Sequence, residues 1–382
     1  MICIENARLV LEEGILEDGA LLIQGGRIAA LGPKGSFGVP EGTERVDAGG
    51  RYLGPGFVDL HVHGGGGHRF PLEPEAAAAH FLARGETSVL ATFYHDMTPA
   101  EMLEGFGRVR AAMAAGGAGG AIRGVYMEGP YMNPKFGASP EKNLWRGPIR
   151  PEDYEPLVDA AGDLVRVWAV APEREGLEPF LRYAGKANPG CVFAVGHSEA
   201  SPEQIEALRG YGISLQTHCM DATGRVPRWR GTRGCGPDEW CLTQKDVYAE
   251  LISDSLGIHV DPTLQKLIRA VKGPDRVILI TDGFVSAEPS PERLRHVTDL
   301  CFDRNGDLNG SLLTLDAAAR NYMRHTGASI REAFLAASAN PARAAGLYGD
   351  LGSLAQGKRA DLVLADDRME IGGVWLGGRR IS

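Results

Sequence analysis

The sequence predicts an α/β protein: a (β/α)8 TIM-type barrel with a small β-sandwich domain formed by both ends of the chain. Eight short apolar runs alternate with helix-like segments over residues 53–282, which is the length that a barrel of this type needs. Both chain ends instead alternate apolar and polar residues between glycine turns, a pattern typical of half-exposed strands. We therefore expect one β-domain built from residues 1–52 and 351–382, and a barrel over residues 53–350.

The runs that we assign to barrel strands are nearly all apolar, as expected where helices cover both faces of a sheet. They lie at residues 53–59, 87–93, 122–128, 165–171, 191–197, 212–218, 249–254 and 276–282. Several helix-like segments between them open with Ser, Thr or Asp followed by Pro, a common helix start. Two more helices are expected after the eighth strand, at 314–326 and 329–345.

Composition excludes several classes of protein. The 382 residues are 43% hydrophobic and 23% charged, so the chain can bury a large core and is not disordered. No apolar run reaches the roughly 18 residues of a membrane span, and the first residues do not resemble a secretory signal. A net charge of −9 disfavours nucleic acid as a partner. Six scattered cysteines without a CxxC pair favour a reducing cytoplasm.

Potential metal ligands recur where the predicted strands end. His61 and His63 follow the first strand, Glu128 ends the third, His197 the fifth and His218 the sixth. Active sites of such barrels lie at the face where the strands end, so these side chains can meet. Each alone would more often be an incidental or structural residue, but their shared location favours a site for one or two divalent ions. Imidazole and carboxylate ligands suit Zn, Fe, Mn or Co.

Asp282 ends the eighth strand and is the candidate catalytic residue. A metal ion makes a nucleophile by lowering the pKa of bound water, and a nearby carboxylate can take the proton and deliver it to a leaving group. His259 and Arg225 could hold an anionic part of a substrate. Arg225 opens a stretch with four arginines in ten residues (225–234), which a solvated loop would explain equally well.

The motifs PGFVDLHVHG, EGPYMNP, VGHSEA, THCMDATG, GIHVDP and LITDG, in this order, resemble those of the amidohydrolase superfamily. Within it, the chain looks most like the N-acetylglucosamine-6-phosphate deacetylase family, and the resemblance extends through LGSLAQGKRADLVLAD near the C-terminus. It implies a metal-dependent hydrolase, acting as a homodimer, that removes acetate from N-acetylglucosamine-6-phosphate or a related N-acetylated amino-sugar phosphate.

The resemblance also implies roles for individual residues. Glu128, His197 and His218 match the principal metal ligands, while His61 and His63 match the pair that supplies a second metal in some members. Asp282 matches the catalytic aspartate. His259 matches a histidine that contacts the substrate phosphate, in relatives from the neighbouring subunit of a dimer, and Arg225 matches a phosphate-binding arginine.

Three departures from this family concern substrate recognition. Asp221, followed by Ala222, replaces an amide that helps to hold the phosphate, and a carboxylate there would repel a phosphate unless it were protonated or paired. Ser139 stands near the position of a His or Gln that reaches the acetyl carbonyl. The segment CGPDEWCLTQKD (235–246) replaces the usual one before the seventh strand.

Two alternatives therefore stay open. The enzyme could act on another N-acyl compound or a cyclic amide, as an N-acyl amino acid deacylase or a dihydroorotase-like enzyme does. It could instead be a non-catalytic barrel used for binding, although such a protein would be expected to lose metal ligands, and this chain keeps all five together with Asp282.

Overall fold

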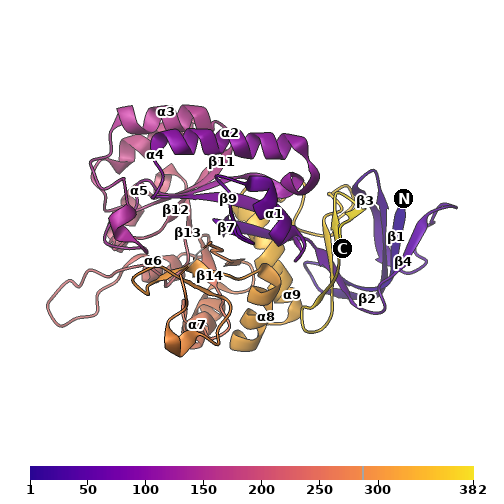
Figure 1. Ribbon diagram of the computed structural model, residues 1–382. Coiled ribbons are helices and arrows are strands. Elements are labelled where there is room, and N and C mark those ends of the chain that lie inside the picture. The colour runs from indigo at the N-terminus through magenta and orange to yellow at the C-terminus, as the bar shows by residue number, and fades with distance from the viewer. Residues whose placement is uncertain (286–287) are drawn as a thin grey trace.

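The computed structural model describes residues 1–285 and 288–382, and its centre is a parallel sheet of eight strands curled into a barrel (Figure 1). Neighbouring strands follow the chain order, from β6 at one end of the sheet to β15 at the other. These strands are β6 (Phe57–Val62), β9 (Glu86–Tyr94), β10 (Ile122–Glu128), β11 (Val165–Val170), β12 (Val192–Val195), β13 (Ile213–Gln216), β14 (Tyr248–Ile252) and β15 (Val277–Ile280). The predicted fold class is confirmed.

The barrel closes just beyond the ends of its first and last strands. Val62 and Gly283 form an isolated parallel bridge. The amide of Asp282 donates to the carbonyl of His61 at 2.9 Å, and the amide of His63 donates to the carbonyl of Gly283 at 2.8 Å. This closure places residue 282 beside the histidine pair, although more than 200 residues separate them in the chain.

Helices cover the outside of the barrel (Figure 1). They are α1 (Pro74–Leu82), α2 (Pro99–Ala115), α3 (Pro151–Ala161), α4 (Leu177–Ala187), α5 (Pro202–Leu208), α6 (Pro237–Thr243), α7 (Pro262–Lys272), α8 (Leu315–Thr326), α9 (Ile330–Phe334) and α10 (Asn340–Ala344). Among the described residues, no helix is both long and apolar enough to cross a membrane.

The predicted helix starts are formed by local hydrogen bonds. The side chains of Thr98 and Ser201 accept from the backbone amides three residues later, at 3.3 Å each, and Asp261 accepts from the amide of Thr263 at 2.7 Å. Each cap satisfies a backbone donor that the first helical turn leaves free. The Ser/Thr/Asp-Pro signals in the sequence therefore mark real helix boundaries at α2, α5 and α7.

Both chain ends form one further sheet beside the barrel (Figure 1). Its strands are β1 (Ile2–Val10), β2 (Ile15–Gln24), β3 (Arg27–Pro33), β4 (Glu44–Asp47), β5 (Tyr52–Pro55), β18 (Leu362–Ala365), β19 (Ile371–Leu376) and β20 (Arg379–Arg380). The first half of β1 pairs with β4 and its second half with β5, so the sheet folds around a core that includes Leu21, Leu53 and Trp375. The domain division at 52/53 and 350/351 stays a prediction, and β5 runs across the first boundary.

The first barrel strand differs from the sequence prediction. The predicted run at 53–59 covers the end of β5 and the start of β6, which are two strands in two different sheets. Gly56 separates them, and a Cβ there would lie 2.0 Å from the hydroxyl oxygen of Thr87, so the chain passes too close to β9 for a side chain. β6 then continues to Val62, so that His61 lies within the strand and only His63 follows it.

Two short strand pairs lie outside the two large sheets, namely β7 (Gly64–Gly65) with β8 (His68–Arg69) and β16 (Leu300–Phe302) with β17 (Leu308–Ser311). The second pair lies close to the barrel closure, because the amide of Ser311 donates to the carbonyl of Asp282 at 2.8 Å. The loop before Ser311 is thereby held over the carboxyl ends of the barrel strands.

Candidate metal centre and active site

The predicted metal ligands meet at the carboxyl ends of the strands. Glu128 is the last residue of β10, and His197 and His218 lie two residues beyond β12 and β13. All three side chains are almost completely buried. Their backbone is unusual, because His197 has a φ of 45° and His218 a φ of 27°. Left-handed backbone at residues other than glycine is strained and concentrates at functional sites.

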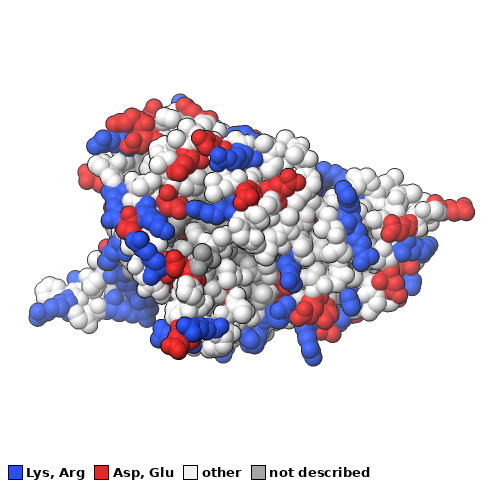
Figure 2. Space-filling view, in the orientation of Figure 1, with Lys and Arg blue, Asp and Glu red and all other residues white. Residues whose placement is uncertain are grey.

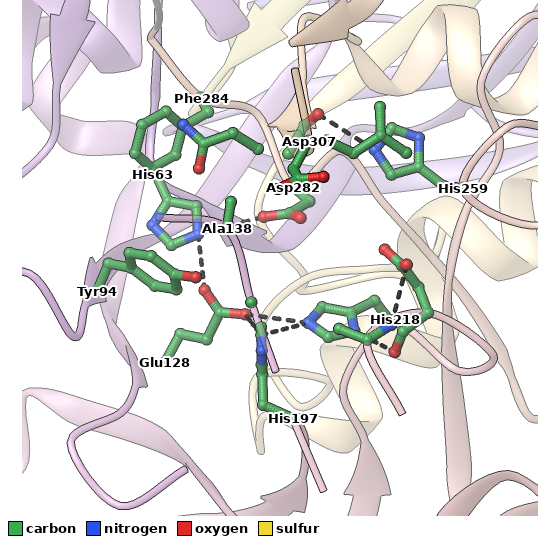
Figure 3. A pocket seen from close by; sticks show the side chains of 16 residues that line it. His63, Tyr94, Glu128, Ala138, His197, His218, His259, Asp282, Phe284 and Asp307 are labelled. Carbon is green, nitrogen blue, oxygen red and sulfur yellow. Dashed lines mark hydrogen bonds and ion pairs between the residues drawn. The ribbon is translucent and has the colours of Figure 1, made fainter. Parts of the chain in front are cut away.

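One group of donor atoms consists of Glu128, His197 and His218 (Figure 3). Oε1 of Glu128 lies 2.7 Å from Nε2 of His197 and 3.0 Å from Nε2 of His218. The two Nε2 atoms are themselves 3.0 Å apart. Three donor atoms of three side chains therefore face one point.

A second group consists of His61, His63, Glu128 and Asp282. The other carboxylate oxygen of Glu128, Oε2, lies 3.0 Å from Nε2 of His63 and 3.4 Å from Nε2 of His61. Oδ1 of Asp282 lies 3.2 Å and 3.4 Å from the same two nitrogen atoms. Glu128 thus belongs to both groups, with one oxygen in each.

These groups fit a divalent cation. Ligand atoms bound to one ion at about 2.0–2.2 Å lie about 3.0–3.5 Å from one another. The distances in both groups match this spacing, except the shorter 2.7 Å between Glu128 and His197. Nδ1 of His218 lies 3.1 Å from the carbonyl oxygen of Asp221, an acceptor, so Nδ1 donates there and Nε2 is the nitrogen left to bind a cation. Nε2 of His61 is buried and has no hydrogen-bond partner among the described residues.

Charge in the centre also favours a cation. Burial alone would raise the pKa of Glu128, but the surrounding histidines hold it well below its usual range. Burial would raise the pKa of Asp282 as well, and His61 and His63 instead lower it, so both carboxylates are ionised. Burial would lower the pKa of His218, but Glu128 raises it to about 9, so without a cation Nε2 holds a proton that a bound cation would replace.

A buried glutamate, Glu250, lies behind His61 of the second group. Oε2 of Glu250, on β14, lies 3.4 Å from Nδ1 of His61 and 3.3 Å from the backbone nitrogen of His218. The hydroxyl of Tyr126 approaches the same oxygen at 3.5 Å. A carboxylate behind a ligating imidazole fixes its orientation and tautomer. Glu250 thus supports both groups without belonging to either.

A pocket opens over this centre (Figure 3). Three of the five predicted substrate-binding residues line it: Asp221, Ala222 and His259. His259 belongs to the same chain as Asp282, so it needs no neighbouring subunit to reach the pocket. Its Nδ1 lies 3.1 Å from Oδ2 of Asp254 and its Nε2 lies 3.1 Å from the carbonyl oxygen of Gly310. Both partners only accept, so both ring nitrogens donate and the imidazole carries a positive charge.

The other two predicted residues do not line this pocket. The amide and hydroxyl of Ser139 donate to Oδ2 of Asp303 at 3.0 and 3.2 Å, and Ser139 faces an adjoining pocket that Arg69 and Lys142 also line. Arg225 pairs with Glu239 at 2.8 Å on the surface. In this chain the two residues lie outside the pocket over the centre, and their contact with a substrate stays a prediction.

The sequence analysis missed several residues that line the pocket, namely Tyr94, Gly137, Ala138, Phe284, Asp307, Leu308, Asn309 and Gly310. One signal could have found Tyr94, because it ends β9 and barrels place functional residues at such positions. No comparable signal exists for residues 307–310, because their place over the pocket follows from contacts of the β16–β17 pair. Burial raises the pKa of Tyr94 well above its usual value, and Glu128 and Asp282 raise it further, so its hydroxyl stays protonated.

Comparison with known proteins then identifies the family. The family model of the amidohydrolases matches residues 52–381. The chain belongs to the amidohydrolase family. This confirms the resemblance seen in the sequence, and the non-catalytic alternative is set aside. The family uses a divalent metal, and the two donor groups of this amidohydrolase could hold one.

Individual relatives resemble this amidohydrolase over their whole length. The N-acetylgalactosamine-6-phosphate deacetylase of Escherichia coli O157:H7 is 33% identical, with 98% of each chain covered. The N-acetylglucosamine-6-phosphate deacetylase of Pasteurella multocida superposes with a TM-score of 0.85 at 25% identity, covering 100% of this chain and 99% of the other. A mutant of the Mycobacterium smegmatis enzyme in complex with N-acetyl-D-glucosamine-6-phosphate gives 0.85 at 29% identity, covering 99% and 98%.

Proposed function

We propose that this amidohydrolase removes the acetyl group from an N-acetylated hexosamine 6-phosphate, with the gluco and galacto sugars as the two candidate substrates. The observation that carries the proposal is the pair of donor groups joined by Glu128, with Asp282 and His259 in the pocket above them. The relatives named for deacetylation of these two sugar phosphates support the substrate class.

We propose the following roles for the residues. Glu128, His197 and His218 hold one ion, and His61 and His63 with Glu128 and Asp282 offer a place for a second. When bound, a divalent ion supplies a Lewis acid that polarises the amide carbonyl and makes water more acidic. Zn, Fe, Mn and Co all suit this set of ligands.

Asp282 acts as the general base and then the general acid. Its carboxylate, ionised next to His63 at 3.2 Å, accepts a proton from the attacking water as the oxygen–carbon bond forms. The same carboxylate then delivers that proton to the amine nitrogen as the carbon–nitrogen bond breaks, leaving acetate and the free amino sugar.

A panel of N-acetyl compounds tests this function on protein of measured metal content. It contains N-acetylglucosamine-6-phosphate, N-acetylgalactosamine-6-phosphate, both unphosphorylated sugars and N-acetyl amino acids, with acetate release as the readout. We expect rapid release from at least one phosphorylated sugar and at least a hundredfold lower kcat/KM for its unphosphorylated form. Equal rates with and without the phosphate would contradict the proposed substrate class.

A second candidate is hydrolysis of an unphosphorylated N-acyl compound. One observation favours it: among the described residues, the pocket lining includes four carboxylates, of Glu128, Asp221, Asp282 and Asp307, and no Lys or Arg. The positive charge of this lining comes from histidines, among them His259. The N-acetyl amino acids of the panel decide between the two candidates.

Asp221→Asn tests how the phosphate is recognised. The carboxylate of Asp221 accepts from the amide of Ala222 at 2.9 Å, and no Lys or Arg of the described chain pairs with it. Removing one repulsive charge at a partly solvated site is worth about 1–2 kcal/mol, so we expect a roughly five- to thirtyfold lower KM for the phosphorylated substrate. KM for the unphosphorylated sugar should stay unchanged. An unchanged KM for both would place the phosphate elsewhere.

We also propose a cytoplasmic homodimer. Cys3, Cys191, Cys219, Cys235 and Cys241 form no disulfide, which suits a reducing compartment. Residues 225–235, which we name the arm, project from the barrel as the pink loop of Figure 1, and the blue side chains on this projection in Figure 2 are arginines. Trp229, near the middle of this segment, is 78% exposed. A projecting aromatic among arginines is typical of a contact with a second chain.

Sedimentation of the intact protein tests the dimer. We expect twice the mass of the chain, and we expect Trp229→Ala to shift the equilibrium toward the monomer because an exposed aromatic anchor is lost. Exposed Leu72, which lies outside the arm, provides the matched control, and Leu72→Ala should leave the mass unchanged. A monomeric wild type would contradict the proposal.

A further inference from the structure

The residues of the metal centre do not themselves include a hydrogen-bond donor for the acyl carbonyl of the substrate. Amide hydrolysis builds negative charge on the carbonyl oxygen, and a hydrogen-bond donor placed there in advance lowers the barrier. The sequence places Ser139 near this carbonyl. Its hydroxyl and its amide are both engaged with Asp303, and it lines the adjoining pocket rather than the one over the metal centre.

The loop that contains Ser139 also runs close to another hydrogen-bond donor, the hydroxyl of Tyr94. Gly137, two residues before Ser139, lines the pocket with Tyr94. A Cβ on Gly137 would lie 2.7 Å from the hydroxyl oxygen of Tyr94 and 3.0 Å from Nδ1 of His197. The φ of Gly137 is +98°, a conformation that suits glycine. Gly137 thus lies close to both the Tyr94 hydroxyl and His197, and its lack of a side chain keeps the space between these two groups free.

The ring of Tyr94 is held firmly in this position. The ring of His95 packs against it with centroids 3.7 Å apart, and the ring of His63 meets it edge-on at 5.3 Å. Phe284 lies edge-on at 6.3 Å on another side. Figure 3 shows the hydroxyl directed into the pocket, on the side of Glu128 and His63. Tyr94 is only 6% exposed, yet it lines the pocket, so its hydroxyl is presented without the freedom of a surface side chain.

From this arrangement we propose that Tyr94 is a catalytic residue, whose hydroxyl donates a hydrogen bond to the acyl carbonyl oxygen and to the oxyanion formed from it. The inference rests on the proposed amide hydrolysis. The hydrogen bond to the acyl carbonyl, which the sequence analysis expected from Ser139, is thereby assigned to Tyr94 at the end of β9. A tyrosine hydroxyl can make this bond without giving up its proton, so the proton balance of the reaction remains with Asp282.

Tyr94→Phe in the metal-loaded enzyme tests the proposal, with Ser139→Ala, in the loop after β10, as the control. Loss of one oxyanion donor typically costs a factor of about 10²–10³ in kcat. We expect a loss in this range for Tyr94→Phe, with KM within about threefold and metal content unchanged. Ser139→Ala should keep kcat within about threefold of the wild type.

A binding measurement gives a second readout. Acetohydroxamate carries the same acyl carbonyl as an N-acetyl group and binds metal centres, and calorimetry gives its Kd without turnover. We expect a roughly five- to thirtyfold weaker Kd for Tyr94→Phe and no change for Ser139→Ala. If the wild type released acetate from no compound of the panel, the proposed function would fail, and the acetohydroxamate comparison would still decide the role of Tyr94.

Three results would overturn the inference. The first is a Tyr94→Phe variant with wild-type kcat and wild-type acetohydroxamate affinity. The second is loss of metal from that variant, which would make Tyr94 a support of the metal centre. The third is a hundredfold loss of kcat in Ser139→Ala, which would return the role to the loop.

Discussion

Glu128→Ala should remove the bound metal and with it the activity. One oxygen of Glu128 faces His197 and His218, and the other faces His61 and His63, so a single substitution takes the carboxylate from both donor groups. The four histidines would then face one another without a negative charge between them, which disfavours binding of a divalent ion. We expect metal content below about one tenth of the wild-type value, measured by elemental analysis, and no detectable acetate release.

Glu86→Ala is the matched control. Glu86 is also completely buried, but it begins β9 at the opposite end of the barrel, where its side chain accepts from the amide of Leu315 at 2.7 Å. Both variants delete a buried carboxylate, so both report the cost to the fold. Glu86→Ala should keep its metal, provided that circular dichroism shows it folded. A Glu128→Ala variant that stays metallated and active would refute the ligand assignment.

Asp282→Asn should lower kcat by a factor of about 10²–10⁴, the range that general acid–base catalysis contributes. The amide has nearly the same shape, but it cannot accept a proton from water at neutral pH. The group of Glu128, His197 and His218 does not include Asp282, so metal bound there should be retained. Acetate release and elemental analysis on the same preparation separate the two effects.

The control for this variant is Asp307→Asn. Asp307 lines the same pocket but belongs to neither donor group, so its loss of charge should change kcat by less than tenfold. Near-normal turnover of Asp282→Asn, or an equal loss in Asp307→Asn, would show that the proton is handled by another group.

The sequence by itself determined the fold class and the place of the centre. The eight apolar runs required a sheet covered on both faces, and the carboxyl ends of parallel strands meet at one edge. Side chains at the ends of distant runs, such as Glu128, His197 and His218, therefore had to converge whatever the loops did. The same logic, applied to the end of the second run, would have found Tyr94.

Only the tertiary structure decided the substrate side of the pocket. Ser139 does not line the pocket over the metal centre, because its amide and hydroxyl both bond to Asp303. That partner lies 164 residues further along the chain, so the sequence around Ser139 gives no sign of it. His259 entered the pocket of its own chain, held by Asp254 and by the carbonyl of Gly310. Loop conformations depend on such long-range partners and carry no periodic pattern that a sequence displays. The barrel therefore determines where the strand ends lie, whereas the conformation of each loop above them depends on the distant side chains that it contacts.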